Sequence, residues 1–144
     1  MTLQELISVL KNRGASFAPA CSIGQINLVN INLQRIHAAT LSTPMANLYQ
    51  TCGGIWMGSG YIFGPQENTY NNKHPIPDIF NINRDLTNLP NMRGKTLFGR
   101  NDLFWFVFDA FGNCAMVDNL NLNVLRKYTD PYQAVYECLV GGKI

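Results

Sequence analysis

The residues best able to do chemistry in this sequence are its four cysteines: Cys21, Cys52, Cys114 and Cys138. They are widely spaced and form no CxxC pair, which argues against zinc and thioredoxin-type sites. Cys52 precedes Gly53-Gly54 at a predicted helix end, where the helix dipole raises a thiol pKa instead of lowering it. We therefore interpret the cysteines as buried, reduced thiols of a cytoplasmic protein.

The two histidines, His37 and His74, are far apart in the sequence, so a metal site with three protein ligands is not expected. We interpret His37 as a residue on a predicted helix, either facing solvent or at the edge of the core. His74 lies among Lys, Asn and Pro residues, which favours an exposed loop position and leaves an interaction contact as the alternative.

Neither the glycines nor the carboxylates match a catalytic motif. The glycines between Gly53 and Gly64 fit neither GxGxxG nor GxxxxGKS, and they follow a predicted helix instead of a strand, so we interpret them as turns. Asp109 and Asp118 fall at the ends of predicted strands, where Asp commonly makes turn hydrogen bonds, and Asp102 adds no pair. The sequence therefore predicts no enzyme, no catalytic or metal-binding residue, and no cofactor.

Composition points to one folded domain, residues 1–144. Charged residues make up only 14% and the net charge is +2, with the densest basic group at Arg93, Lys95 and Arg100. Because nucleic-acid binding normally needs a basic stripe, no nucleic-acid partner is expected. The most apolar run, residues 103–108, is too short to span a bilayer and no leader peptide is visible, so we expect no membrane association.

Helices are predicted first along the chain. Thr2 and Glu5 form a T-x-x-E capping box before an amphipathic stretch that Gly14 ends. Ile31, Ile36 and Ala39 indicate part of a second helical face. A third helix has Thr43 as its cap, Pro44 in its first turn, and Gly53-Gly54 as its end.

Strands dominate from residue 55 onward. Residues 55–57 and 61–63 predict a hairpin around Gly58-Ser59-Gly60, and four consecutive strands are predicted over 96–99, 103–108, 114–117 and 124–128. A final helix starts with Asp130 as N-cap and Pro131 at its first position. This order predicts an α+β fold with a mostly antiparallel mixed sheet, flanked by N-terminal helices and a C-terminal helix.

Residues 64–95 are rich in Pro, Asn and charge, and are predicted to be largely loop with a short helical turn near Asp78 to Arg84. A loop of this length is unusual inside a compact domain, so it indicates a functional segment or structure hidden from sequence reasoning.

The order of motifs resembles the SMI1/KNR4 superfamily, also called SUKH. The stretch Thr43-Pro44 through Tyr49 to Cys52-Gly53-Gly54 is similar to a helix end of that family, and the hairpin over Ile55 to Gly64 is similar to its first strands. Leu97-Phe98-Gly99-Arg100, then residues 104–112 and Asp118, resemble its strand meander, and residues 128–139 resemble its terminal helix. The resemblance covers roughly residues 40 to 141, and residues 15–40 match poorly.

The resemblance implies a binding module, most often a bacterial immunity protein that neutralises a cognate toxin by stoichiometric binding. A regulatory or scaffold adaptor with several protein partners is the alternative that some members of the superfamily imply. Immunity proteins against nucleases are commonly acidic, whereas this chain is slightly basic, which argues against a nuclease target.

The partner is expected to contact residues 64–95 and the adjacent aromatic hairpin, because loops often carry function and Trp, Tyr and Arg are favoured anchors. For Trp56, core packing is weighed as the stronger alternative. The candidate partner-binding residues are Trp56, Tyr61, Tyr70, His74, Arg84 and Arg93.

Overall fold

The computed structural model describes residues 1–70 and 74–141, with the side chains of Tyr70 and His74 left outside the description. Its helices are α1 (Leu3–Asn12), α2 (Ile23–Arg35), α3 (Thr43–Thr51), α4 (Ile79–Asn83) and α5 (Pro131–Val140), with 3-10 turns η1 (Leu86–Asn88) and η2 (Pro90–Met92). Its strands are β1 (Ser16–Phe17), β2 (Ile55–Met57), β3 (Gly60–Ile62), β4 (Asn68–Tyr70), β5 (His74–Ile76), β6 (Lys95–Arg100), β7 (Phe104–Asp109), β8 (Cys114–Asp118) and β9 (Val124–Tyr128).

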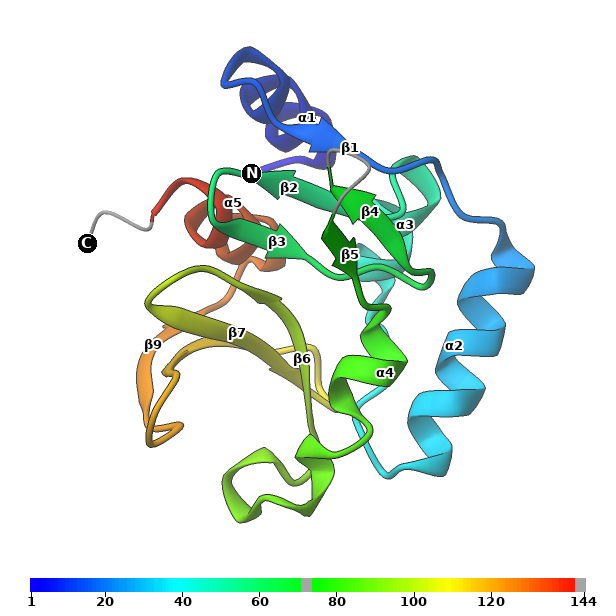
Figure 1. Cartoon of the computed structure of the whole chain (residues 1–144), viewed down its shortest axis with the longest axis vertical. Coiled ribbons are helices and arrows are strands. Elements are labelled where there is room, and N and C mark those ends of the chain that lie inside the picture. The colour runs from blue at the N-terminus through cyan, green and yellow to red at the C-terminus, as the bar shows by residue number, and fades with distance from the viewer. Residues whose placement is uncertain (71–73, 142–144) are drawn as a thin grey trace.

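A seven-stranded sheet in the order β1-β2-β3-β6-β7-β8-β9 forms the centre of the fold, and β4 and β5 make a separate hairpin. Each pairing between described strands is antiparallel. Figure 1 shows β6 to β9 on one side of the molecule, α4 and the β4–β5 hairpin in the middle, and α2 on the other side. The predicted α+β class, with N-terminal helices and a closing helix, is confirmed.

The core lies between the sheet and α5, which contacts β2, β3 and β6 to β9. Ala134, Val135 and Cys138 of α5 are fully buried, and so are Phe106 and Phe108 of β7. These side chains continue into one core cluster that includes the inner faces of α1, α2 and α3. Burying large side chains of this kind stabilises a fold by about 1.5–3 kcal/mol each, so α5 fixes which face of the sheet turns inward.

The helix starts follow local hydrogen-bonding chemistry. Thr2 Oγ1 accepts from the Glu5 backbone N–H, and Gly14, with φ +83°, follows the end of α1 as predicted. Asp130 accepts from the Tyr132 backbone N–H at the start of α5. The cap predicted at Thr43 is wrong by one residue: Ser42 is the N-cap of α3 and Thr43 is the first helical residue.

The prediction for α2 missed its register and both ends. Ser22 and Gln25 form a complete capping box, so the helix begins at Ile23, and it ends at Arg35 before Ala39. Its buried positions are Ile26, Val29 and Leu33, whereas Ile31 is 47% exposed. Uncharged polar residues lie between the apolar ones along this segment, so the sequence alone allowed two different apolar faces for the helix. Packing against the core selects one of them.

Residues 64–95 contain more structure than predicted. They form the β4–β5 hairpin, α4, η1 and η2, and only the short helix near Asp78 was expected. Asp78 Oδ1 accepts from the Asn81 backbone N–H at 2.7 Å, which starts α4. The strand β5 was missed because it includes Pro75, a residue usually excluded from paired strands but tolerated at an edge.

The buried side chain of Asn83 attaches this segment to the sheet. It is fully buried at the end of α4, where its Oδ1 accepts from Leu97 N and its Nδ2 donates to Leu97 O. The same Nδ2 donates to Ile79 O. Asn83 thus pairs with β6 where the short strand β3 has ended. No helix in the described ranges is long and apolar enough to cross a membrane.

Candidate protein-interaction surface

Strand register brings four large polar or aromatic side chains into one row across the sheet. Trp56 of β2 is directly opposite Tyr61 of β3, Tyr61 is opposite Arg100 of β6, and Arg100 is opposite Trp105 of β7. Residues directly opposite in antiparallel strands share a face and have Cβ atoms about 4.5–5.5 Å apart. We call these four residues the aromatic–arginine row. It contains both tryptophans of the chain.

The aromatic–arginine row faces away from α5. A Cβ added to Gly60 would lie 3.0 Å from Cys138 O, and one added to Gly99 would lie 3.0 Å from Cys138 Sγ, so these glycines face the helix. Successive residues of a strand point to opposite faces. Tyr61 and Arg100, each next to one of these glycines, therefore point to the face that α5 leaves uncovered.

A groove of about 200 Å³ opens beside the row. Tyr61 and Arg100 form one side, and residues of the β4–β5 hairpin and α4 form the other. Its full lining is Tyr61, Phe63, Pro75, Ile76, Pro77, Ile82 and Arg100, and we call it the proline groove. Residues from the first hairpin, from the predicted loop and from the end of β6 thus meet at one place.

The backbone beneath the row is held by polar contacts. Asn101 is buried, and its Nδ2 donates to Cys138 O at 3.1 Å in α5. Its Oδ1 accepts from Leu103 N and Phe104 N, which shapes the turn between β6 and β7. These bonds fix the turn between the strands that carry Arg100 and Trp105, so the exposed Arg100 and the partly buried Trp105 start from a rigid support.

The structure brings two of the six predicted partner-binding residues together, Trp56 and Tyr61. Both are partly buried and pack against the core, so Trp56 combines the packing role and the surface position that the sequence had offered as alternatives. Tyr70 and His74 are paired residues of the β4–β5 hairpin, but their side chains lie outside the described residues. Arg84 and Arg93 are exposed, and neither lines the proline groove.

Sequence reasoning missed Arg100 and Trp105 as candidate site residues. Arg100 was noted only in the densest basic group and in the stretch that resembles SMI1/KNR4. Trp105 was noted only within a predicted strand and in the same resemblance. The pairing register of β3, β6 and β7 supplies the missing information, because it places residues about forty positions apart in sequence side by side. The crossover between β3 and β6 leaves no local sequence signal for this pairing.

The cysteines are buried and lie outside this surface. Burial raises the pKa of Cys52 to about 11 and that of Cys114 to about 12, and it also raises the pKa values of Cys21 and Cys138. These thiols are therefore protonated near neutral pH and poorly nucleophilic. Within residues 1–70 and 74–141, no group of three or more His, Cys, Asp or Glu side chains could hold a metal ion.

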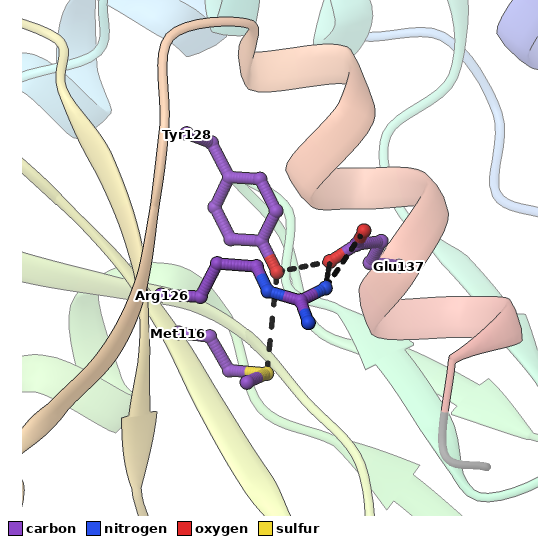
Figure 2. Close-up of polar contacts among 4 residues, drawn as sticks. All are labelled: Met116, Arg126, Tyr128 and Glu137. Atoms are coloured by element: carbon purple, nitrogen blue, oxygen red, sulfur yellow. Dashed lines mark hydrogen bonds and ion pairs between the residues drawn. The ribbon is translucent and has the colours of Figure 1, made fainter. Parts of the chain in front are cut away.

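A second polar cluster lies on the α5 side of the sheet (Figure 2). Tyr128 of β9 donates its hydroxyl to Glu137 of α5, and Arg126 Nη1 pairs with Glu137 Oε2 at 3.0 Å. Burial and the bond to Glu137 raise the pKa of Tyr128. This cluster joins the last strand to the last helix, which is a structural role.

The turn carboxylates are engaged as predicted. Asp109 Oδ1 accepts from the backbone N–H groups of Phe111 and Asn113 in the β7–β8 turn. Asp118 Oδ1 accepts from Leu120 N at 2.7 Å in the β8–β9 turn. Both acids therefore fix hairpin geometry, as Asp does in many turns.

No family model, curated protein or solved structure matches this chain.

Proposed function

We propose that this chain is a protein-binding module that neutralises a cognate bacterial toxin by stoichiometric binding. The observation that carries the proposal is the aromatic–arginine row on the sheet face that α5 leaves uncovered. The resemblance to the SMI1/KNR4 superfamily supplies the toxin as the partner class. The same resemblance and the reduced cysteines favour action in the cytoplasm.

The composition of the row supports a protein partner. Trp, Tyr and Arg are the residue types most enriched among interface positions that lose 2 kcal/mol or more of binding energy on truncation. Here they stand on paired strands, and Asn101 fixes the turn between the two strands that carry Arg100 and Trp105, so little backbone ordering is needed on binding. A rigid aromatic surface with a central Arg suits one tight partner better than many weak ones.

The chemistry of the remaining reactive groups also supports a binding role. All four thiols are buried with raised pKa values, and the turn acids Asp109 and Asp118 are occupied by backbone N–H groups. None of these groups lines the proline groove. A binding function, by contrast, would use the side chains of the aromatic–arginine row.

The proposal is tested by capturing the tagged full-length chain from a lysate of its native source and identifying co-purifying proteins by mass spectrometry. A single toxin domain recovered near one-to-one, whose activity the chain suppresses in a co-expression assay, is the expected result. Several unrelated partners at lower recovery, with no rescue from any of them, would replace the proposal with the adaptor alternative.

A further inference from the structure

We propose that the partner segment recognised here carries a carboxylate side chain that binds Arg100 and an adjacent apolar side chain that enters the proline groove. This inference rests on the proposed function and names the chemistry of the toxin surface that the chain would bind.

The size of the groove indicates what enters it. Pockets for cofactors and other small molecules typically measure about 300–1,000 Å³. The proline groove holds about 200 Å³, which is room for one side chain of a docking segment. Its walls are mostly apolar, with Phe63, Ile82 and Pro77 among them, so the entering side chain is apolar.

Among the described residues that line the groove, Arg100 is the only one with a formal charge. It is exposed, and no carboxylate within the described part of the chain forms an ion pair with it. A guanidinium offers donors in a planar fork that matches a carboxylate, and such charge-assisted bonds are stronger than neutral ones. Tyr61 and Trp105 lie opposite it on the two neighbouring strands.

The charge of the neighbouring surface points the same way. A second hollow on this face, of about 510 Å³, has Val107 and Val124 among its lining residues together with Lys95 and Lys127. Asp109 is the one acidic residue that lines it, and its Oδ1 already accepts two backbone N–H groups. An acidic partner surface complements this face, whereas the basic cleft of a nuclease would be repelled.

The test is a selection of peptides from a random twelve-residue phage-displayed library on the immobilised full-length chain. Wild type is expected to enrich Asp or Glu next to an apolar residue by tenfold or more over the unselected library. Arg100→Glu should abolish this enrichment and favour Lys or Arg at the same position. Arg35→Glu is the matched control, since it makes the same charge change on an exposed residue of α2 outside the groove.

Two results would overturn the inference: no enrichment of acidic residues by wild type, or acidic enrichment that persists in Arg100→Glu. Binding of a single-stranded DNA oligonucleotide that the same change abolishes would also overturn it, by assigning the surface to nucleic acid. Thermal unfolding of each variant establishes that it is folded before selection. A toxin that still binds the native chain through another surface would leave the proposed function standing and remove only this inference.

Discussion

The side-chain amide of Asn83 bonds to both backbone groups of Leu97. Its Oδ1 accepts from Leu97 N at 2.7 Å, and its Nδ2 donates to Leu97 O at 2.8 Å. In a sheet these groups would pair with a neighbouring strand, but β3 ends at Ile62, and the backbone that follows it bonds to β6 at Phe98, which accepts from Phe63 N. Asn83 thus substitutes for a missing strand residue, and it holds one wall of the proline groove at a fixed distance from the other.

We expect Asn83→Ala to lower the free energy of unfolding by about 2–4 kcal/mol. The change removes three side-chain bonds and leaves the buried N–H and C=O of Leu97 unpaired. Urea unfolding measures the loss. Asn81→Ala is the matched control, because the Asn81 side chain is exposed and bonds only to Asp78, and its effect should stay within about 1 kcal/mol. Equal effects of the two substitutions would contradict the bridging role of Asn83.

Substitution by alanine should change the stability of the fold in opposite directions at two glycines, Gly64 and Gly24. A Cβ on Gly64 would lie 1.5 Å from Gly53 O, so Gly64→Ala forces two backbone segments apart and should destabilise the fold by about 3 kcal/mol or more. Gly24→Ala, in the first turn of α2, meets only Ser22 Oγ at 3.8 Å and should stabilise by about 0.5 kcal/mol. Thermal unfolding of both variants checks the pair. A Gly64 variant as stable as wild type would show that these segments do not touch.

Stability should decline as pH rises above about 9. The thiols of Cys52 and Cys114 have an ordinary pKa of 9.0, which burial raises to about 11 and about 12 in the folded chain. Between these values the unfolded chain has lost protons that the native chain keeps, so unfolding is favoured by about 1.4 kcal/mol per pH unit for each thiol. Below pH 9 both states keep the protons and this stabilisation is fully present.

Urea unfolding at pH 8, 9, 10 and 11 under reducing conditions measures this dependence. Replacing Cys52 with Ala should make the loss of unfolding free energy between pH 9 and 11 smaller, with the contribution of Cys114 remaining. The variant is expected to be less stable than wild type at every pH. Unchanged stability across this range in wild type would mean that the thiols titrate normally and are not buried as described.

Tyr128 and Arg126, two residues of the cluster in Figure 2, should contribute unequally to the free energy of unfolding. Tyr128→Phe removes the hydroxyl that donates to Glu137 from a side chain that is only 8% exposed, and it should cost about 1 kcal/mol. Arg126→Ala breaks an ion pair whose Arg side chain is 46% exposed, and solvent screening keeps its contribution smaller. Chemical denaturation of both variants measures which substitution lowers the free energy of unfolding more. A larger loss for Arg126→Ala would contradict the prediction.

The sequence predicted the elements whose signals are local. The start of α5 follows from Asp130 and Pro131, and the β2–β3 hairpin from Gly58, which has φ +59° in its turn. The strand pattern of residues 95–128 was also correct. Apolar segments mark the strands, and the turn acids Asp109 and Asp118 mark the ends of β7 and β8. In these places one short segment contains the whole physical cause.

The features that the sequence did not predict depend on contacts between residues far apart in the chain. Asn83 lies in the predicted helical turn near Asp78 to Arg84, but only its contact with Leu97, fourteen positions away, explains its burial. The site was half predicted for the same reason: Trp56 and Tyr61 are neighbours across a short hairpin, whereas Arg100 joins them only through the β3–β6 pairing. Residues 63–98 connect the two paired strands, and the composition of such a connection does not determine which later strand pairs with β3.

The most direct test of the central claim is the amount of co-purifying partner that three versions of the full-length chain retain from one native lysate. Wild type and Arg35→Glu should retain the same protein near one-to-one, and Arg100→Glu should retain less than a tenth of that amount. Equal retention by all three versions, with each shown to be folded, would contradict the claim that the aromatic–arginine row is the binding surface.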